Sequence, residues 1–174
     1  MNQRHRIAIG LGSNLGDRLG LMRVAAARLR DDMLDRTVAS HIYETAPWGI
    51  VDQPSFLNAV IMGETEWKPP AVFNFIKSLE KELGRVPSRR YGPRAIDLDI
   101  LAWSGGIWNE DGLEIPHPGL TAREFVLRPL CDVWPEWEHP ELHRRASGLL
   151  TDWLRTQPST ATQIEAPLLD KESP

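Results

Sequence analysis

Residues 92–101, Gly-Pro-Arg-Ala-Ile-Asp-Leu-Asp-Ile-Leu, alternate apolar and acidic side chains, and this pattern constrains the fold more than any other in the chain. Successive side chains of a β-strand point to opposite faces. The stretch therefore predicts a strand with Ile96, Leu98 and Ile100 on one face and Asp97 and Asp99 on the other. Residues two apart on a strand lie roughly 7 Å apart at the backbone, so the two carboxylates could share a hard cation.

A basic run lies just upstream of this strand and contains Arg85, Arg89, Arg90 and Arg94. Phosphate is held by fixed positive charge and magnesium prefers oxygen ligands, so carboxylates beside arginines are typical of a site for a magnesium-bound polyphosphate. The alternative is a half-buried strand with a solvated acidic face. The residues of this stretch alone leave both interpretations open.

The size and composition predict one globular domain. With 174 residues, 41% hydrophobic and 25% charged, the chain can build one sizeable core, which we expect within residues 1–157. Residues 158–174 are rich in Pro, Ser, Thr and Ala, and we expect a loose tail there.

The net charge and the cysteine content limit the classes of partner and the cellular compartment that we expect. A net charge of −4 disfavours a general nucleic-acid binder, although residues 85–94 form a local basic patch. The single cysteine, Cys131, excludes an intrachain disulfide framework and fits a reducing compartment. No apolar run approaches the roughly 20 residues of a membrane helix. We expect a cytoplasmic protein with small-molecule substrates, no membrane association and no obligate protein partner.

The order of the remaining elements predicts a ferredoxin-like fold. Strands are expected at residues 6–11, 37–45 and 55–63, with one helix after the N-cap Asp17 and another between Pro69 and Gly84. Together with the acidic strand this gives β-α-β-β-α-β, an antiparallel sheet with helices on one face. A hairpin turn at 103–109 with an extended return at 113–117, an apolar segment at 125–130 and a helix at 144–155 follow. The spacing of Gly10, Gly12 and Gly16 is one residue off the dinucleotide-binding fingerprint and disfavours a Rossmann site.

Five stretches taken together resemble one family, the 6-hydroxymethyl-7,8-dihydropterin pyrophosphokinases of folate biosynthesis. They occur in order between about residues 6 and 140, and they are Gly12-Ser13-Asn14-Leu15-Gly16-Asp17; Tyr43-Glu44-Thr45-x-Pro47-x-Gly49 with Asp52-Gln53-Pro54-x-Phe56-Leu57-Asn58-Ala59; Glu80-x-x-x-Gly84-Arg85; Gly92-Pro93-Arg94-x-Ile96-Asp97-Leu98-Asp99; and Pro116-His117-Pro118-x-x-x-x-Arg123-x-Phe125. The family has a ferredoxin-like fold. The resemblance implies transfer of pyrophosphate from MgATP to the hydroxymethyl group of a reduced pterin, with release of AMP.

The resemblance also assigns roles to residues. It implies that Asp97 and Asp99 bind two magnesium ions and, with Arg85 and Arg94, form the catalytic group. The ATP-binding residues that it implies are Lys77, Arg90, Tyr91, Ile100, His117 and Arg123. The pterin-binding residues that it implies are the amide Asn58, the aromatic pair Phe56 and Phe125, and Thr45 and Trp48, near which the pterin pocket is completed.

Some positions depart from the family, and two other functions compete. Lys77 stands where some members carry a polar amide, Tyr91 replaces the usual tryptophan, and the loop between Arg85 and Gly92 is one residue shorter. Without the resemblance, Phe56 and Phe125 are better explained as core residues and His117 as an ordinary loop histidine. The competing functions are a magnesium-dependent phosphotransferase that releases ADP, and a ferredoxin-like binding module without catalysis.

Overall fold

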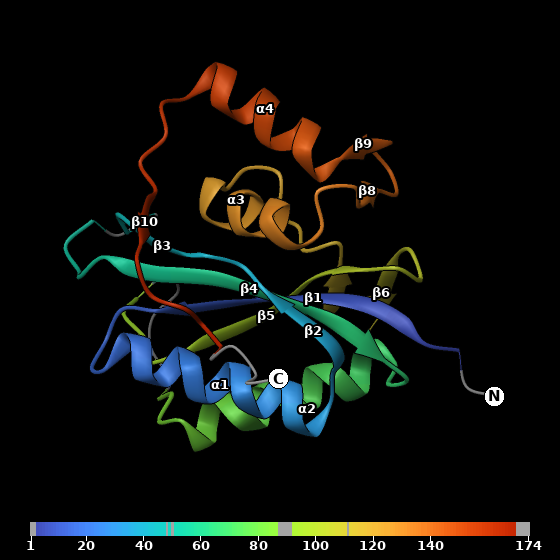
Figure 1. Ribbon diagram of the computed structural model, residues 1–174, viewed down its shortest axis with the longest axis horizontal. Coiled ribbons are helices and arrows are strands. Elements are labelled where there is room, and N and C mark those ends of the chain that lie inside the picture. Colours follow the sequence, from blue (N-terminus) through green and yellow to red (C-terminus); the bar gives the residue numbers. More distant parts are fainter. Residues whose placement is uncertain (1–2, 48, 50, 87–91, 111, 170–174) are drawn as a thin grey trace.

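In a computed structural model of the chain, one central sheet separates two layers of helices (Figure 1). The structure describes residues 3–169 apart from 48, 50, 87–91 and 111. Within these residues the sheet contains β1 (His5–Ser13), β2 (Asp35–Ala39), β3 (Ile42–Thr45), β4 (Phe56–Thr65), β5 (Asp97–Trp103) and β10 (Thr162–Ile164). The strand order is β10-β3-β4-β1-β5, β2 also pairs with β4, and every pairing is antiparallel.

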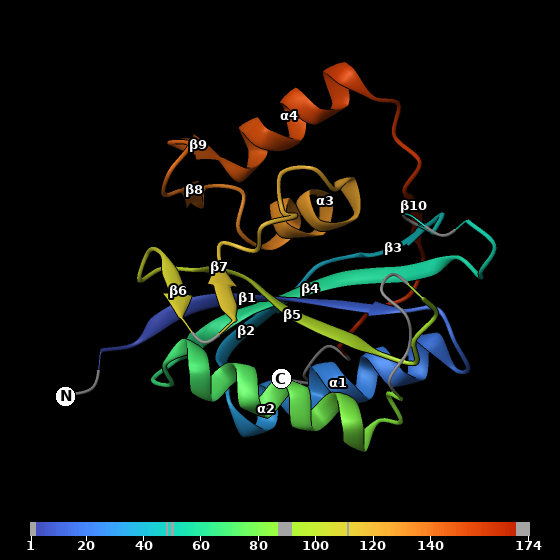
Figure 2. The same ribbon diagram turned by 180° about the vertical axis from the view of Figure 1, so that it is seen from behind.

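The helices cover both faces of the sheet. Helices α1 (Arg18–Asp32) and α2 (Pro69–Glu82) lie on one face, and α3 (Glu124–Val133) and α4 (Ala146–Thr156) lie on the other, as the view from behind also shows (Figure 2). Two small hairpins complete the fold, β6 (Trp108–Glu110) with β7 (Leu113–Ile115), and β8 (Glu138–His139) with β9 (Arg144–Arg145). No helix within the described part of the chain has the length and apolarity needed to cross a bilayer.

The ferredoxin-like prediction is confirmed, and so are the signals that start and stop its helices. The Asp17 carboxylate accepts a hydrogen bond from the Gly20 N–H at 3.0 Å and caps α1. Pro69 opens α2, where a missing N–H costs nothing. Gly84 follows α2 with φ of 88°, a conformation that glycine adopts without strain.

Three sequence predictions differ from the structure. The strand expected at 37–45 is two strands, because Ser40 interrupts the ladder: its Oγ accepts from the Val60 N–H at 2.8 Å. The turn of the hairpin lies between β6 and β7 at Gly112, while Gly105 and Gly106 only lead from β5 into β6. The segment expected as a loose tail from residue 158 contains β10 and the buried Leu168.

Two hydrophobic cores lie on opposite faces of the sheet. Alternation along β1 places Ile7 and Ile9 toward α1 and α2, and Ala8 toward α3. A β-bulge opposite the Ala8–Ile9 step inserts one extra residue in β5, so that Leu101 and Ala102 both join the α3 core. Beyond the bulge, toward the start of β5, the polar residues of the acidic strand point to the α3 face.

Candidate active site

A cavity of about 700 Å³ opens on the α3 side of the sheet, where β1 ends and β4 and β5 begin. It lies on the face that carries Asp97 and Asp99, while Ile96, Leu98 and Ile100 are buried in the opposite core, as the alternation predicted. The cavity brings together ten of the predicted site residues, which are Thr45, Phe56, Asn58, Arg85, Arg94, Asp97, Asp99, His117, Arg123 and Phe125.

The wall formed by β1 is bare backbone, because Gly10 and Gly12 occupy the two positions that face the cavity. A Cβ at Gly12 would lie 3.4 Å from the Asn58 Oδ1 and take up space beside it. The spacing of these glycines was weighed as a dinucleotide fingerprint, and Gly12 also belongs to the first matching stretch, but neither observation predicted this role. The strand expected at 6–11 contains only Gly10; because β1 extends to Ser13, Gly12 lies on the same face.

An amide and two aromatic rings line one part of the cavity, which we call the amide end. Asn58 is 7% exposed, and its Nδ2 donates to the Thr45 Oγ1 at 2.8 Å. The hydrogen bond fixes the orientation of the amide in the wall. Phe56 starts β4 and Phe125 lies in the first turn of α3, so the two rings come from opposite layers. Trp48, predicted beside them, lies outside the described residues.

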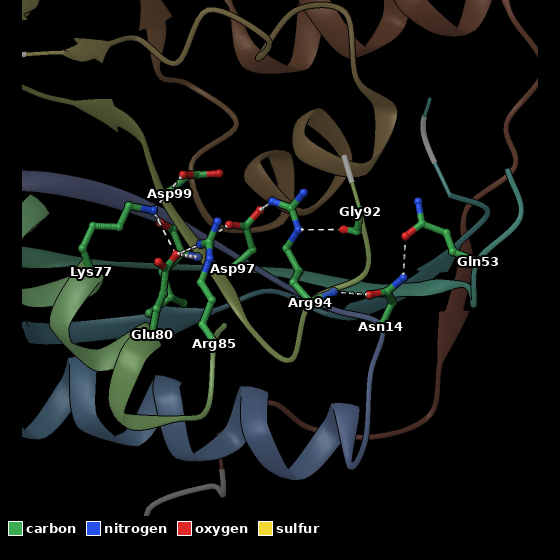
Figure 3. A network of polar contacts seen from close by, with 10 residues as sticks. Asn14, Gln53, Lys77, Glu80, Arg85, Gly92, Arg94, Asp97 and Asp99 are labelled. Carbon is green, nitrogen blue, oxygen red and sulfur yellow. Dashed lines mark hydrogen bonds and ion pairs between the residues drawn. The ribbon is translucent and has the colours of Figure 1, made fainter. Parts of the chain in front are cut away.

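The charged residues, whose contacts Figure 3 shows, line the part that we call the charged end, and it adjoins the amide end at Gly12, where a Cβ would lie within 4 Å of both Asn58 and Asp97. Asp97 accepts from Arg85 at 2.6 Å through Oδ1 and from Arg94 at 2.7 Å through Oδ2. Asp99 is 40% exposed at its side chain, against 22% for Asp97, and it pairs with Lys77 at 3.3 Å. The two carboxylates thus lie within a group of cations, and neither is isolated from the cavity.

Glu80 anchors this charged group from the α2 side. Its side chain is 3% exposed, and its Oε1 accepts from the Leu98 N–H at 2.7 Å and pairs with Lys77 and Arg85 at 2.9 and 2.5 Å. Burial raises the pKa of the Glu80 carboxyl, and Lys77, the Leu98 amide and Arg85 oppose this shift. Burial lowers the pKa of Arg85, but Asp97 and Glu80 outweigh it and leave the pKa raised. Arg85 is therefore held as a cation in the wall.

Lys77 and Ile100 lie away from the cavity. The Lys77 ammonium donates to the Leu98 carbonyl at 2.7 Å as well as to Glu80, so it supports β5 from α2. Ile100 is 3% exposed and packs in the core between the sheet and α1 and α2. Its side chain therefore does not reach the cavity, contrary to its expected contact with a nucleotide. The other two predicted ATP-binding residues, Arg90 and Tyr91, fall outside the described part of the chain.

His117 and Arg123 lie on the loop that enters α3. The Gly119 N–H donates to the His117 Nδ1 at 3.0 Å, so the neutral ring carries its own proton on Nε2. Burial lowers the pKa of His117 and favours this neutral form. The Arg123 guanidinium lies 5.8 Å from the centre of the Phe125 ring and packs against Gly119, where a Cβ would come within 2.7 Å of it.

Asn14 ties the loops at the charged end together, a role that sequence analysis did not assign. It is 2% exposed, its Oδ1 accepts from the Arg94 N–H at 2.8 Å, and its Nδ2 donates to the Pro54 carbonyl and the Gln53 side chain at 3.0 and 3.1 Å. The loop before β4 and the loop before β5 are thus joined through one side chain (Figure 3). Only its place in the first matching stretch pointed to it.

The donor set fits magnesium bound together with a phosphorylated ligand. Within the described residues no three His, Cys, Asp or Glu side chains form a metal-binding group. Magnesium in nucleotide sites typically uses one or two carboxylates and takes its other ligands from water and phosphate. Asp97 and Asp99 match that pattern.

Comparison with known proteins places the chain in a family. The family model described as "7,8-dihydro-6-hydroxymethylpterin-pyrophosphokinase (HPPK)" matches residues 8–135. A 2-amino-4-hydroxy-6-hydroxymethyldihydropteridine pyrophosphokinase of Methylorubrum extorquens is 42% identical over 132 residues, which are 75% of this chain and 84% of the relative. The folic acid synthesis protein FOL1 of Dictyostelium discoideum is 40% identical over 137 residues, 79% of this chain. This chain spans only 21% of that longer relative.

Solved structures agree in fold. A wild-type HPPK-DHPS of Plasmodium falciparum, crystallised with pterin and p-hydroxybenzoate, has a TM-score of 0.67 at 16% identity and covers 88% of this chain and 42% of its own. A second HPPK-DHPS, in complex with substrates, has a TM-score of 0.71 at 15% identity, with 88% and 44% covered. With the family model matching most of its length, the chain belongs to the 7,8-dihydro-6-hydroxymethylpterin-pyrophosphokinase family.

Proposed function

We propose that this protein transfers pyrophosphate from MgATP to the hydroxyl of 6-hydroxymethyl-7,8-dihydropterin and releases AMP. One observation carries the proposal: a single cavity is lined by two carboxylates and several arginines and, beside them, by an amide and two phenylalanines. The charged end suits a polyphosphate, and the aromatic end suits a flat heterocycle with hydrogen-bonding edges. Both substrates are small molecules, and the single cysteine supports a reducing, cytoplasmic location.

The pterin would bind at the amide end. Phe56 and Phe125 would stack on its two faces, and Asn58 would read its edge while Thr45 holds the amide in place. The absence of side chains at Gly10 and Gly12 leaves room for the ring beside the sheet. Trp48 is proposed to complete the slot.

The triphosphate would bind at the charged end. Arg85, Arg94 and Arg123 would hold its oxygens, and the neutral His117 would donate from Nε2. Asp97 and Asp99 would hold two magnesium ions, which when bound offset the charge of the phosphates. Arg90 and Tyr91 are proposed to contact the nucleotide as well, and Lys77 would act indirectly by holding Asp99 and Glu80.

The reaction would depend on positioning and electrostatics. The pterin hydroxyl attacks the β-phosphorus in line, the O–P bond forms as the bond to the α-phosphate oxygen breaks, and AMP leaves with that oxygen. Arg85 and Arg94 would stabilise the charge on the transferred group. The hydroxyl proton would leave to water, because no general base stands out among the described residues that line the cavity: both carboxylates are paired with cations.

Product analysis tests the proposal. The protein is incubated with MgATP and 6-hydroxymethyl-7,8-dihydropterin, and the nucleotide products are separated. We expect AMP and the pterin diphosphate in equal amounts. ADP as the main product would indicate a different phosphotransferase, and absence of ATP consumption that depends on both pterin and magnesium would favour a binding module.

A further inference from the structure

The segment that follows α4 crosses the edge of the sheet from the α3 layer to the α1 layer (Figure 1). We call residues 158–169 the strap. Its strand β10 pairs with β3, its Leu168 is 2% exposed in the core below the sheet, and its Pro167 carbonyl accepts from the Arg23 Nε at 3.1 Å. The strap is therefore fixed to the sheet and to α1.

On its way the strap bonds to a buried carboxylate at the start of α3. Glu124 has a side chain that is 4% exposed, and its Oε1 accepts from the Ser159 hydroxyl while its Oε2 accepts from the Thr160 N–H at 3.0 Å. Arg128, one turn later, donates to the same Oε1 at 2.7 and 2.9 Å. A buried charge needs such partners, so the position of Glu124 depends on the strap.

Glu124 lies between two residues that line the cavity. Arg123 and Phe125 flank it in sequence, so the same turn of α3 faces the strap on one side and the cavity on the other. The last turn of α3 is fixed separately, because Asp132 accepts from the Tyr43 hydroxyl at 2.9 Å and from the His41 N–H at 3.1 Å. The first turn of α3 is held in place by the strap instead, through Glu124.

The strap also supports the opposite wall of the amide end. Thr162 of β10 lies opposite Glu44 of β3, and the next residue is Thr45, whose Oγ1 receives the Asn58 amide. Among the residues that the structure describes, the strap bonds to Arg23, Glu124 and β3, and not to Asp97 or Asp99. Its support is thus concentrated on the elements that carry Phe125 and Thr45.

We propose that Glu124 is a positioning residue, which with Ser159 and Thr160 of the strap holds the first turn of α3 where Phe125 meets the heterocyclic substrate. This rests on the proposed function. Loss of its charged hydrogen bonds would raise the KM for the pterin about tenfold. The KM for MgATP would change less, since Arg123 is the one proposed phosphate ligand beside this turn, while Arg85 is held by Asp97 and Glu80, and Arg94 by Asp97.

Steady-state kinetics with each substrate varied in turn test the proposal. The variants are Glu124→Gln and Ser159→Ala, with Ser159→Thr as the matched control that keeps the hydroxyl. Glu138→Gln controls for loss of an acidic charge on an exposed site. We expect a selective rise in the pterin KM for Glu124→Gln and Ser159→Ala, and wild-type values for both controls.

Two results would overturn the proposal: an unchanged pterin KM in both test variants, or a fall in kcat with an equal rise in both KM values, which indicates general loss of structure. If the wild-type protein forms no AMP, the proposed function fails and the strap is judged by hydrogen exchange instead. The amides of Val126 and Leu127, which donate to the Arg123 carbonyl at 3.1 and 3.0 Å, should then exchange faster in Glu124→Gln. Equal exchange rates would reject the strap as a support for α3.

Discussion

The Asp97 carboxylate accepts hydrogen bonds from two guanidinium groups at once, and a ligand that binds to any of these groups must compete with those bonds. Arg85 and Arg94 each donate to a different oxygen of the carboxylate. A magnesium ion alone would have to displace the two arginines from the Asp97 carboxylate. A polyphosphate alone would have to draw the same arginines away from that carboxylate. The magnesium complex of ATP supplies a cation for the carboxylate and oxygens for the arginines together, so we expect it to bind better than either part.

Removing one carboxylate charge should stop turnover without unfolding the protein. Asp97→Asn and Asp99→Asn keep the side-chain size but remove the charge that would hold magnesium, and kcat should fall at least about a hundredfold. Circular dichroism should match the wild type. Glu114→Gln, an exposed carboxylate outside the cavity, is the control. Near-normal turnover of either aspartate variant would refute the metal assignment.

At the scale of elements, the sequence predicted strands better than their interruptions. The period of two in residues 96–100 correctly separated the acidic face from the core, since alternation follows from strand geometry. The bulge beside Leu101 has no such signal, because it depends on pairing with β1. The same holds for the break at Ser40, whose hydroxyl replaces a ladder bond with β4.

The candidate site, like the strands, could be predicted only in part from the sequence. Residue types and spacing with the family resemblance located the cavity side chains, among them Asn58 and Arg123. For Ile100 the two kinds of evidence disagreed: the alternation placed its side chain on the apolar face, where it lies, whereas the resemblance assigned it to the nucleotide. Contacts between distant segments, such as those of Glu124 with the strap, could not be predicted from local pattern.

The loop junction at Asn14 should be sensitive to loss of its amide. Asn14→Ala removes three hydrogen bonds at a buried position, and the free energy of unfolding should fall by about 1–3 kcal/mol. Urea denaturation measures the change, with Asn109→Ala at an exposed site as the control. Equal stability of the two variants would mean that the loops before β4 and β5 are held by other contacts.

At the scale of the whole molecule, two cores share one sheet, and the strap reaches both sides of it. Its sequence is polar and Pro-containing, which is typical of a tail, yet Ile164 and Leu168 pack against the core beside α1. Burial of a few apolar side chains was enough to order a segment whose composition predicted otherwise.

Truncation of Leu168 should therefore destabilise the protein as a core substitution does. Leu168→Ala should lower the free energy of unfolding by about 2–5 kcal/mol. Leu154→Ala, at a side chain 39% exposed in α4, should cost far less. Thermal and chemical denaturation of the two variants compare them directly. A Leu168→Ala protein as stable as the wild type would show that this end of the strap contributes nothing to the fold.

The stability gained from Glu124 should depend on pH. Burial raises its pKa, but the bonds from Ser159, Thr160 and Arg128 outweigh it and hold the pKa below the usual 4.5. A depressed pKa in the folded state gives stability that is present above the unfolded value and is lost as pH falls through the folded value. The stability difference between wild type and Glu124→Gln should thus be constant near neutral pH and shrink below about pH 4.5, as urea denaturation across the acid range would show.

The path of the strap also bears on synthesis. In a chain made from its N-terminus, every residue proposed to touch a substrate leaves the ribosome before β10 does. The sheet that carries Asn58 and Asp97 can therefore form while β3 still has an open edge, and α3 can pack before its first turn has the bonds from Ser159 and Thr160. The nascent protein would thus form the part of the proposed site that lies on the sheet before the support that we propose for Phe125 is in place.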